Sequence, residues 1–255
     1  MKYLLPILIA LFLLAGCQTA PKPAAPVPTT GADPFWPADG VFPAEGRTSS
    51  WPGFRAKNVE RRTLFAQNRQ ADRNGVVFVG DSITEGWKTL AQDFSEVHVK
   101  VVNRGIGGDT TPNLLYRLQA DVLDLQPRAL VVLIGTNDLG EHTSPEAVAS
   151  NLRMFHDRVR AAYPTIPIAW CLVMPRALNR DYPSRINELN ELIVKLAATD
   201  HGITICDTFA PLAQPDGSSK PECFNPDRLH LNPTGYAVWR SALLPIVAGW
   251  KLDGH

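Results

Sequence analysis

The chain has 255 residues, and its 25 Lys and Arg residues balance its 25 Asp and Glu residues, so the formal net charge at pH 7 is zero. This balance argues against a nucleic-acid-binding protein, which usually carries a basic excess, and against a disordered acidic chain. Hydrophobic residues make up 45% of the chain, and four cysteines are too few for a disulfide scaffold. The composition therefore predicts a globular protein with a substantial core.

The first residues of the chain predict an export signal. Lys2 precedes a short, uncharged apolar run, which is the layout of a secretory signal peptide and is too short to span a bilayer as a helix. The following Leu14-Ala15-Gly16-Cys17 resembles the lipobox of bacterial lipoproteins, which implies a signal peptide of residues 1–16 and lipidation of Cys17. Gln18 in the next position implies transport to the outer membrane. The alternative is an ordinary secretory signal in which the cysteine is incidental.

Residues 17–52 are rich in Pro, Ala, Gly and Thr. Such a stretch cannot bury enough apolar surface to fold alone, and its prolines favour extended conformations. We interpret its first part as a tether that holds a folded domain away from a membrane. The aromatic residues in Phe35-Trp36 and in Trp51-Pro52-Gly53-Phe54 predict that its later part docks on that domain. We expect one domain over residues 53–255, because the chain has no internal repeat.

Beyond the tether, short apolar runs alternate with amphipathic stretches. Runs that are apolar throughout predict strands buried on both faces, and the stretches between them predict helices. This alternation predicts an α/β protein in which helices cover both faces of a five-stranded parallel sheet. The strands are expected over 76–79, 97–102, 129–134, 168–173 and 203–206, and the helices over 54–72, from Thr111, after Ser144, around 186–196 and from Asn232 to about Trp250.

Residues suited to catalysis follow several of these strands. Ser82 comes directly after the first strand, the glycine-rich segment 103–108 follows the second, and Asn137 follows the third. Asp227-Arg228-Leu229-His230 lies in a long loop after the fifth strand. Functional groups of parallel sheets gather at the carboxyl ends of the strands. Each segment also has a structural interpretation: a helix cap for the serine, tight turns for the glycines and the Asp/His pair, and a loop contact for the asparagine.

Taken together, these segments resemble the four sequence blocks of the SGNH, or GDSL-type, hydrolases. The blocks are Gly80-Asp81-Ser82-Ile83, Gly105, Gly135-Thr136-Asn137-Asp138 and Asp227-x-x-His230, and the resemblance covers about residues 74–250. The first two blocks are most similar to the branch of platelet-activating factor acetylhydrolase subunits and bacterial acetyl esterases. The resemblance implies a flavodoxin-like three-layer α/β/α sandwich and a serine esterase that needs no cofactor.

A serine hydroxyl is a weak nucleophile until a base removes its proton. His230 is the candidate base for Ser82, and Asp227 is the candidate group that orients the imidazole and stabilises its charged form. The resemblance implies that the backbone N–H groups of Ser82 and Gly105 and the side-chain amide of Asn137 form the oxyanion hole. The chain has no cluster of residues with metal-ligand spacing, so we expect no metal.

Five other residues invite a functional interpretation. His142 is the only positional rival to the candidate base, but it has no acidic neighbour at a comparable spacing except Glu141. Asp81 and Asp138 are expected to hold their loops by accepting backbone N–H bonds. Cys171 and Cys206 lie in strand patterns and are interpreted as buried thiols rather than nucleophiles.

The predicted activity is hydrolysis of short-chain oxygen esters, above all acetyl esters, with envelope or plant-type polysaccharides as candidate substrates. Lysophospholipase, thioesterase, arylesterase and acyltransferase activities remain open, because the same site supports other acyl chemistry. A non-catalytic binding protein of the cell envelope is the alternative from a different class. We expect a bacterial envelope location through the lipid anchor, an ester substrate as partner, and no nucleic acid.

Overall fold

The structure is a computed structural model, and it describes residues 35–176 and 182–252. The predicted signal peptide, Cys17 and the first part of the predicted tether lie outside the described residues. The strands form a single parallel sheet with the order β2-β1-β3-β4-β5. They are β1 (Val76–Gly80), β2 (Val101–Gly105), β3 (Ala129–Leu133), β4 (Ile168–Cys171) and β5 (Ile203–Cys206).

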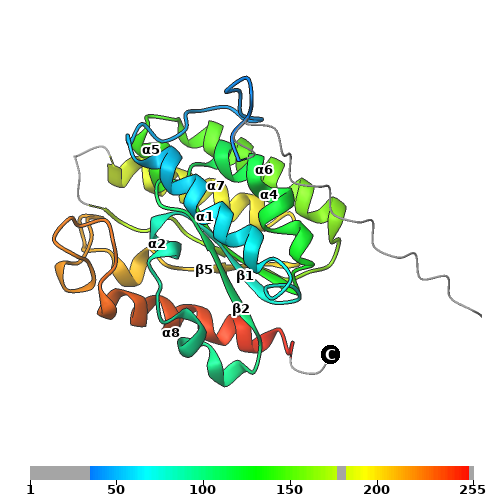
Figure 1. The fold of residues 1–255 in the computed structure, drawn as a ribbon. Coiled ribbons are helices and arrows are strands. Elements are labelled where there is room, and N and C mark those ends of the chain that lie inside the picture. Colours follow the sequence, from blue (N-terminus) through cyan, green and yellow to red (C-terminus); the bar gives the residue numbers. More distant parts are fainter. Residues whose placement is uncertain (1–34, 177–181, 253–255) are drawn as a thin grey trace, which may run out of the picture.

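Helices cover both faces of this sheet, so the predicted three-layer α/β fold is confirmed (Figure 1). One face packs on α4 (Thr111–Asp121), α6 (Pro145–Ala162) and α7 (Tyr182–Ala197), and the other on α3 (Leu90–Asp93) and α8 (Pro233–Gly249). Alternate residues of each strand enter opposite clusters, as the pleat requires. No helix in the described part of the chain is both long enough and apolar enough to cross a membrane.

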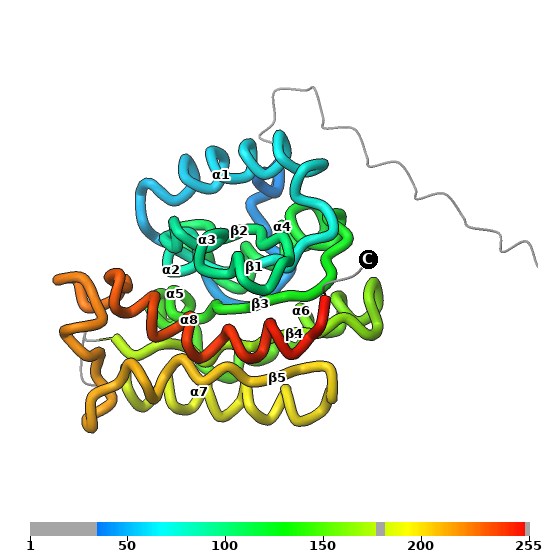
Figure 2. The backbone as a smooth tube through the Cα atoms, turned by 90° about the horizontal axis from the view of Figure 1, so that it is seen from below, coloured from blue at the N-terminus to red at the C-terminus, as the bar shows by residue number. Residues whose placement is uncertain are grey.

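Three further helices matter for the function of the protein. Two of them are very short and follow strands directly: α2 (Ser82–Glu85) follows β1, and α5 (Thr136–Gly140) follows β3. The third, α1 (Phe54–Asn68), lies beyond the β2 edge, as Figure 2 shows. The α1 side chains Phe54 and Phe65 pack there with Ile106 in a small separate cluster.

The second strand begins later than the sequence pattern predicts. Residues 95–97 form a 3-10 turn, and His98 follows it with φ 49°, a left-handed conformation that no strand continues. The ladder with β1 therefore starts at Val101. The apolar residues Val97 and Val99 pack at the margin of the cluster under α8 instead. Apolar alternation alone could not distinguish a packed turn from a strand.

Residues 35–53, here called the strap, dock on the domain. The ring of Trp36 meets the rings of Phe42 and Phe54 edge-on, with centroids 5.0 and 6.0 Å apart. Arg62 of α1 donates a hydrogen bond of 2.8 Å to the carbonyl of Phe35. The strap is thus held by aromatic contacts, as its composition predicts, and by a charged side chain that the pattern does not reveal.

Candidate active site

Ser82 occupies the first position of α2, immediately after β1. Asp81 caps this helix, because its Oδ1 accepts a hydrogen bond of 2.9 Å from the backbone N–H of Ile83. The first N–H groups of a helix have no partner within the helix. The N–H of Ser82 has no hydrogen-bond partner among the described residues. The Ser82 hydroxyl and a free backbone N–H therefore lie together at the rim of the sheet.

The imidazole of His230 joins Ser82 to Asp227. His230 Nε2 lies 2.8 Å from Ser82 Oγ, and Nδ1 lies 2.6 Å from Asp227 Oδ2. Partial burial acts to raise the pKa of Asp227, but hydrogen bonds from the ring and backbone of His230 outweigh it, so the pKa is lowered and the carboxylate stays ionised. These contacts can carry a proton from the serine to the imidazole while the carboxylate orients the ring.

The loop that carries His230 is exposed but held in place by hydrogen bonds. Asp227 Oδ1 accepts bonds of 3.0 Å from the backbone N–H groups of Leu229 and His230. Arg228, with φ 56°, bonds through its guanidinium to the hydroxyl and carbonyl of Ser219. These contacts tie the start of the loop to its end, and they fix the ring of His230 without burying it.

Gly105 does not supply the oxyanion donor that the resemblance implied. Its N–H donates to Asn103 Oδ1 at 3.0 Å, and it pairs with Gly80 in the sheet. A Cβ at position 105 would lie 2.2 Å from the backbone nitrogen of Glu85. Glycine is therefore needed here because α2 packs directly on β2, and the prediction for the Gly105 N–H is wrong.

A glycine turn beside the nucleophile lies further along the same segment. Ile106 to Asp109 forms a turn, closed by a 3.0 Å hydrogen bond from the Asp109 N–H to the Ile106 carbonyl. Gly108 has φ 82°, as the third position of a type II turn requires, and its N–H has no partner within residues 35–176 and 182–252. At the neighbouring Gly107, a Cβ would lie 3.8 Å from the Cβ of Ser82. The run of glycines pointed to this turn, but its spacing did not show which N–H is free.

Asn137 lies beside this turn. It belongs to α5, and its side-chain amide donates a 2.9 Å hydrogen bond to the carbonyl of Asp109. An asparagine amide has two N–H donors, so a second one remains. The next residue, Asp138, accepts bonds of 2.9 and 2.6 Å from the N–H and hydroxyl of Thr111. Asp138 thus ties the third strand end to α4, which is the loop-holding contact that the sequence predicted.

Glu85 is a positioning residue that the sequence analysis missed. Its Oε2 accepts a short 2.6 Å hydrogen bond from the N–H of Gly107. Lys57 and Arg61 of α1 lie 3.9 and 3.8 Å from its Oε1. The available signal was spacing, because positions i and i+3 of a helix share a face and Glu85 is three residues after Ser82. The carboxylate links the glycine turn to the helix that carries the nucleophile.

A layer of buried charge lies beneath the site. Burial raises the pKa of Asp81 to about 7, of Asp109 to about 6 and of Asp138 to about 7. Arg117 is fully buried and donates a 2.8 Å hydrogen bond to Asp109 and a 3.2 Å bond to the carbonyl of Gly80. Among these three carboxyl groups, Arg117 pairs with Asp109 alone, and burial, which disfavours a charged carboxylate, is the main cause of all three raised pKa values.

The other candidates of the sequence analysis stay outside this cluster. The partner of the Ser82 hydroxyl is His230, not the rival His142. Cys171 and Cys206 are buried thiols on neighbouring strands, as predicted. Within the ranges that the structure describes, no group of three or more His, Cys, Asp or Glu side chains could hold a metal ion.

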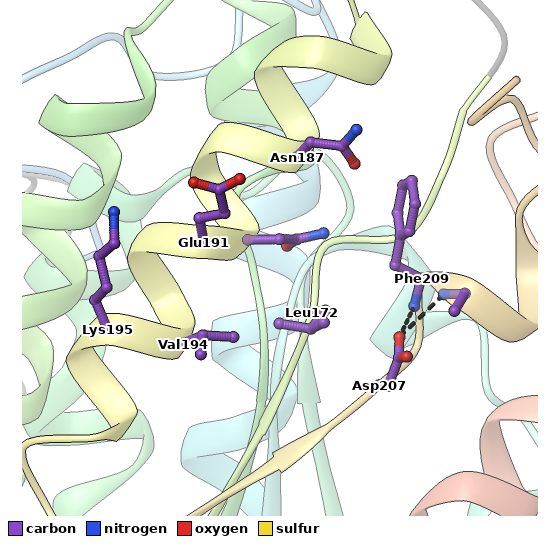
Figure 3. A pocket seen from close by; sticks show the side chains of 9 residues that line it. Leu172, Asn187, Glu191, Val194, Lys195, Asp207 and Phe209 are labelled. Carbon is purple, nitrogen blue, oxygen red and sulfur yellow. Dashed lines mark hydrogen bonds between the residues drawn. The ribbon is translucent and has the colours of Figure 1, made fainter.

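Among the hollows in the described part of the chain, two of similar size lie near the carboxyl end of the sheet. One, of about 470 Å³, lies between α7 and the ends of β4 and β5, where Leu172, Val194 and Phe209 form an apolar lining (Figure 3). No residue of the Ser82 cluster lines it. The other, of about 500 Å³, lies beside the cluster, between Gly86 after α2 and Leu231 after the candidate base.

Comparisons with known proteins agree with this geometry. Residues 78–238 match the GDSL-like lipase/acylhydrolase family. The human platelet-activating factor acetylhydrolase IB subunit alpha2 is 32% identical over 190 residues, which cover 69% of this chain and 76% of that protein. A GDSL-like lipase from Bacteroides thetaiotaomicron is 26% identical, with a TM-score of 0.63 over 76% of this chain and 96% of that one. A carbohydrate esterase family 3 protein from Talaromyces cellulolyticus shares the fold, at 16% identity and a TM-score of 0.57 over 71% of this chain and 100% of that one.

Proposed function

The chain belongs to the GDSL-like lipase/acylhydrolase family and is an ester-hydrolysing enzyme, and on that premise we propose that it removes short acyl groups, above all acetyl, through an acyl-enzyme on Ser82. The observation that carries this proposal is the unbroken hydrogen-bonded chain from Ser82 Oγ through His230 to Asp227, at 2.8 and 2.6 Å. The preference for acetyl is supported by the name of the human relative, an acetylhydrolase.

Acylation begins when His230 Nε2 takes the proton of Ser82 as Oγ attacks the ester carbonyl carbon. The tetrahedral intermediate collapses, the bond to the alcohol oxygen breaks, and the imidazolium gives its proton to that oxygen. Water then attacks the acyl-serine with the same imidazole as base, which releases the acid and restores the hydroxyl. Asp227 stabilises the imidazolium in both halves, and its lowered pKa keeps it ionised for this role.

We infer that three donors stabilise the negative oxygen of the tetrahedral intermediate. We assign them as the backbone N–H groups of Ser82 and Gly108 and the second N–H of the Asn137 amide. Support comes from the two backbone donors that lack partners among the described residues and from the contact of the Asn137 amide with Asp109, the neighbour of Gly108. Losing one such donor typically lowers kcat by about 10²–10³-fold.

The alcohol part of the substrate is proposed to be a glycan of the cell envelope or of plant type. The support is the predicted export signal and lipid anchor at Cys17, which would place the enzyme among such polymers. From Cys17 to the docked Phe35 is eighteen residues, an extended reach of roughly 60 Å at most. Such a reach is long enough for a lipid-anchored domain to meet polymers above a membrane.

The proposal is tested with purified wild-type and Ser82→Ala proteins on p-nitrophenyl acetate. The wild-type enzyme should turn over this ester, and the variant should lose at least about 10⁴-fold in kcat. Mass spectrometry of the quenched wild-type reaction should show one added acetyl group on the peptide that contains Ser82. Equal rates for the two proteins, or label on another residue, would overturn the assignment. A series of p-nitrophenyl esters of increasing acyl length should show the highest kcat/KM at acetyl.

The anchor is tested separately by replacing Cys17 with Ser. We expect the wild-type protein to fractionate with outer membranes and Cys17→Ser to be recovered in the soluble fraction. A wild-type protein that is soluble, or a variant that stays with the membranes, would rule out the lipid anchor. Neither result bears on the esterase assignment.

A further inference from the structure

The strap passes over the rim of the catalytic site, between the glycine turn and α5. Ser50 donates hydrogen bonds of 2.7 and 2.9 Å, from its N–H and hydroxyl, to Oε1 of Glu141 at the end of α5. On the other side, Ser49 Oγ lies 3.3 Å from where a Cβ on Gly108 would be. Figure 1 shows this part of the chain, in blue, running past α5 to the start of α1. The strap therefore forms a wall beside the proposed oxyanion donors, although it precedes the matched family region.

The position of this wall is fixed along its length. Asn151 of α6 donates a 2.6 Å hydrogen bond to the carbonyl of Glu45. Gly46, with φ 109°, packs so closely on Thr143 that a Cβ would lie 2.9 Å from its methyl group. After the wall, Phe54 is buried and begins α1. Residues 46–53 are thus held at both ends, as a substrate-binding wall requires.

Trp51 is the one tryptophan of the chain that is exposed, with half of its surface, 50%, accessible to water. Its N–H lies 3.3 Å from Ser49 Oγ, and its carbonyl accepts a 2.9 Å bond from the N–H of Phe54. The indole folds back over Gly53, where a Cβ would lie 2.5 Å from the ring. A single exposed apolar side chain is common on protein surfaces, so what distinguishes Trp51 is its place in the strap that borders Gly108. Its backbone is fixed by hydrogen bonds, and its ring packs against Gly53.

The surroundings of Trp51 favour a neutral, hydroxyl-rich ligand. Lys57 reaches the same rim, because a Cβ on Gly107 would lie 3.8 Å from the Cγ of Lys57. Lys57 pairs with Glu60 at 2.9 Å, and Lys57 and Arg61 both approach Glu85, so the charges of these four side chains balance and favour neither a cationic nor an anionic headgroup. A long acyl chain would meet the polar strap residues Ser49 and Ser50. A pyranose ring offers both an apolar C–H face for the indole and hydroxyl groups for these polar neighbours.

We propose that Trp51 is a stacking platform for a sugar ring in the alcohol part of the ester, so that the strap makes the enzyme selective for acetylated glycans. This inference rests on the proposed function and adds the residue that recognises the alcohol. The platform binds substrate outside the reacting atoms. It therefore contributes to the KM of glycan esters and contributes nothing to small esters that have no sugar.

The test compares the full-length wild-type enzyme with Trp51→Ala and Trp51→Phe on two substrates, acetylated xylo-oligosaccharide and p-nitrophenyl acetate. For the oligosaccharide, Trp51→Ala should raise KM about tenfold, equivalent to about 1.4 kcal/mol, while Trp51→Phe should keep most of the affinity. For p-nitrophenyl acetate, both variants should stay within about twofold of the wild type. Leu64→Ala is the matched control, because Leu64 is also an exposed apolar residue but lies on α1 away from the strap.

A second readout does not depend on turnover. In the Ser82→Ala background, unlabelled xylo-oligosaccharide should bind about tenfold more weakly when Trp51 is also replaced by Ala, as measured by calorimetry. Equal loss of activity on both substrates, or unchanged oligosaccharide affinity, would overturn the platform while leaving the esterase assignment intact. Failure of the wild-type enzyme to hydrolyse either ester would instead reject the proposed function itself.

Discussion

The two regions that meet at the candidate active site differ in how they hold their residues. On the nucleophile side, Asp81 and Asp138 are wholly buried beneath the rim, where Asp81 caps α2 and Asp138 ties α5 to the start of α4. On the base side, the side chains of Asp227 and His230 are 48% and 38% exposed, and their loop is held by its own hydrogen bonds. The comparison teaches that one half is positioned by the core and the other by local loop chemistry.

The difference has a consequence for mutation. A substitution on the base side removes catalytic groups from the surface, so it should affect activity much more than stability. A substitution on the nucleophile side disturbs buried hydrogen bonds, so it should affect both. The following experiments challenge this contrast, starting from the largest expected effect.

Substitutions of His230 and Asp227 should give the greatest losses of activity. We expect His230→Ala to lower kcat by about 10⁴–10⁶-fold and Asp227→Asn by about 10⁴-fold, because the imidazole loses its orienting carboxylate. Exposed positions usually change the free energy of unfolding by only about 0.5 kcal/mol, and urea denaturation should show this. If either variant were strongly destabilised, the base loop would be part of the cooperative core and the contrast would fail.

Asn137→Ala should combine both kinds of effect. Loss of one oxyanion donor should lower kcat by about 10²–10³-fold with little change in KM, and loss of the bond to Asp109 should cost about 1 kcal/mol of stability. Asn113→Ala is the control, since Asn113 is likewise hydrogen-bonded, to Thr110, but is fully buried and lies in α4. The control should lose stability and keep its kcat, and an equal loss of kcat in both would show that Asn137 is merely structural.

Glu85 should give a smaller effect that depends on hydrogen bonding. Glu85→Ala should lower kcat about tenfold, because the bond to Gly107 is worth roughly 1–2 kcal/mol and positions the glycine turn. Glu85→Gln should recover most of the rate, since an amide oxygen can also accept from the Gly107 N–H. Glu60→Ala, which removes the other partner of Lys57, should leave kcat unchanged. A Gln variant no better than Ala would show that charge, not the hydrogen bond, is what matters.

The buried carboxyl of Asp138 should be visible in the pH dependence of stability. Burial raises its pKa from 3.8 to about 7, so the folded protein holds a proton that the unfolded chain releases. Its contribution to stability is therefore present below about pH 4 and is lost as pH rises to about 7. We therefore expect this carboxyl to make the Tm of the wild-type protein fall between about pH 4 and pH 7, and Asp138→Asn should reduce that fall. Each kcal/mol of lost stability corresponds to roughly 2–4 °C in Tm. The exposed Asp157→Asn should leave the profile unchanged, and a parallel profile for Asp138→Asn would contradict the assignment.

The sequence predicted the architecture well because strands that are buried on both faces have an unmistakable composition. It also predicted which residues reach the rim, since Ser82 and Asn137 lie two and four residues after the ends of their strands. The meeting of Ser82 with His230, 148 residues apart, could be expected only through the resemblance to a family. The pattern of residues along the chain does not show how close two loops lie in space.

The errors lie where several similar residues stand close together. Between positions 105 and 108 the sequence offers three glycines, and only the hydrogen bond from Gly105 to Asn103 shows that this N–H is already used. The start of the second strand was misplaced for a related reason, because apolar residues near Val97 pack without pairing. The contacts of the strap with α5 depend on tertiary packing, so no local pattern announces them.

The strap precedes the region that matches the family, yet it lies against Gly108 and beside α5. The segment that borders the reactive centre is therefore separate in the chain from Ser82, Asp227 and His230, which perform the chemistry. Conversely, a recombinant protein that begins at Phe54 would keep all five strands, the nucleophile and the base but lose this border. Screening such a fragment on small chromogenic esters would give a misleading picture of what the intact enzyme selects.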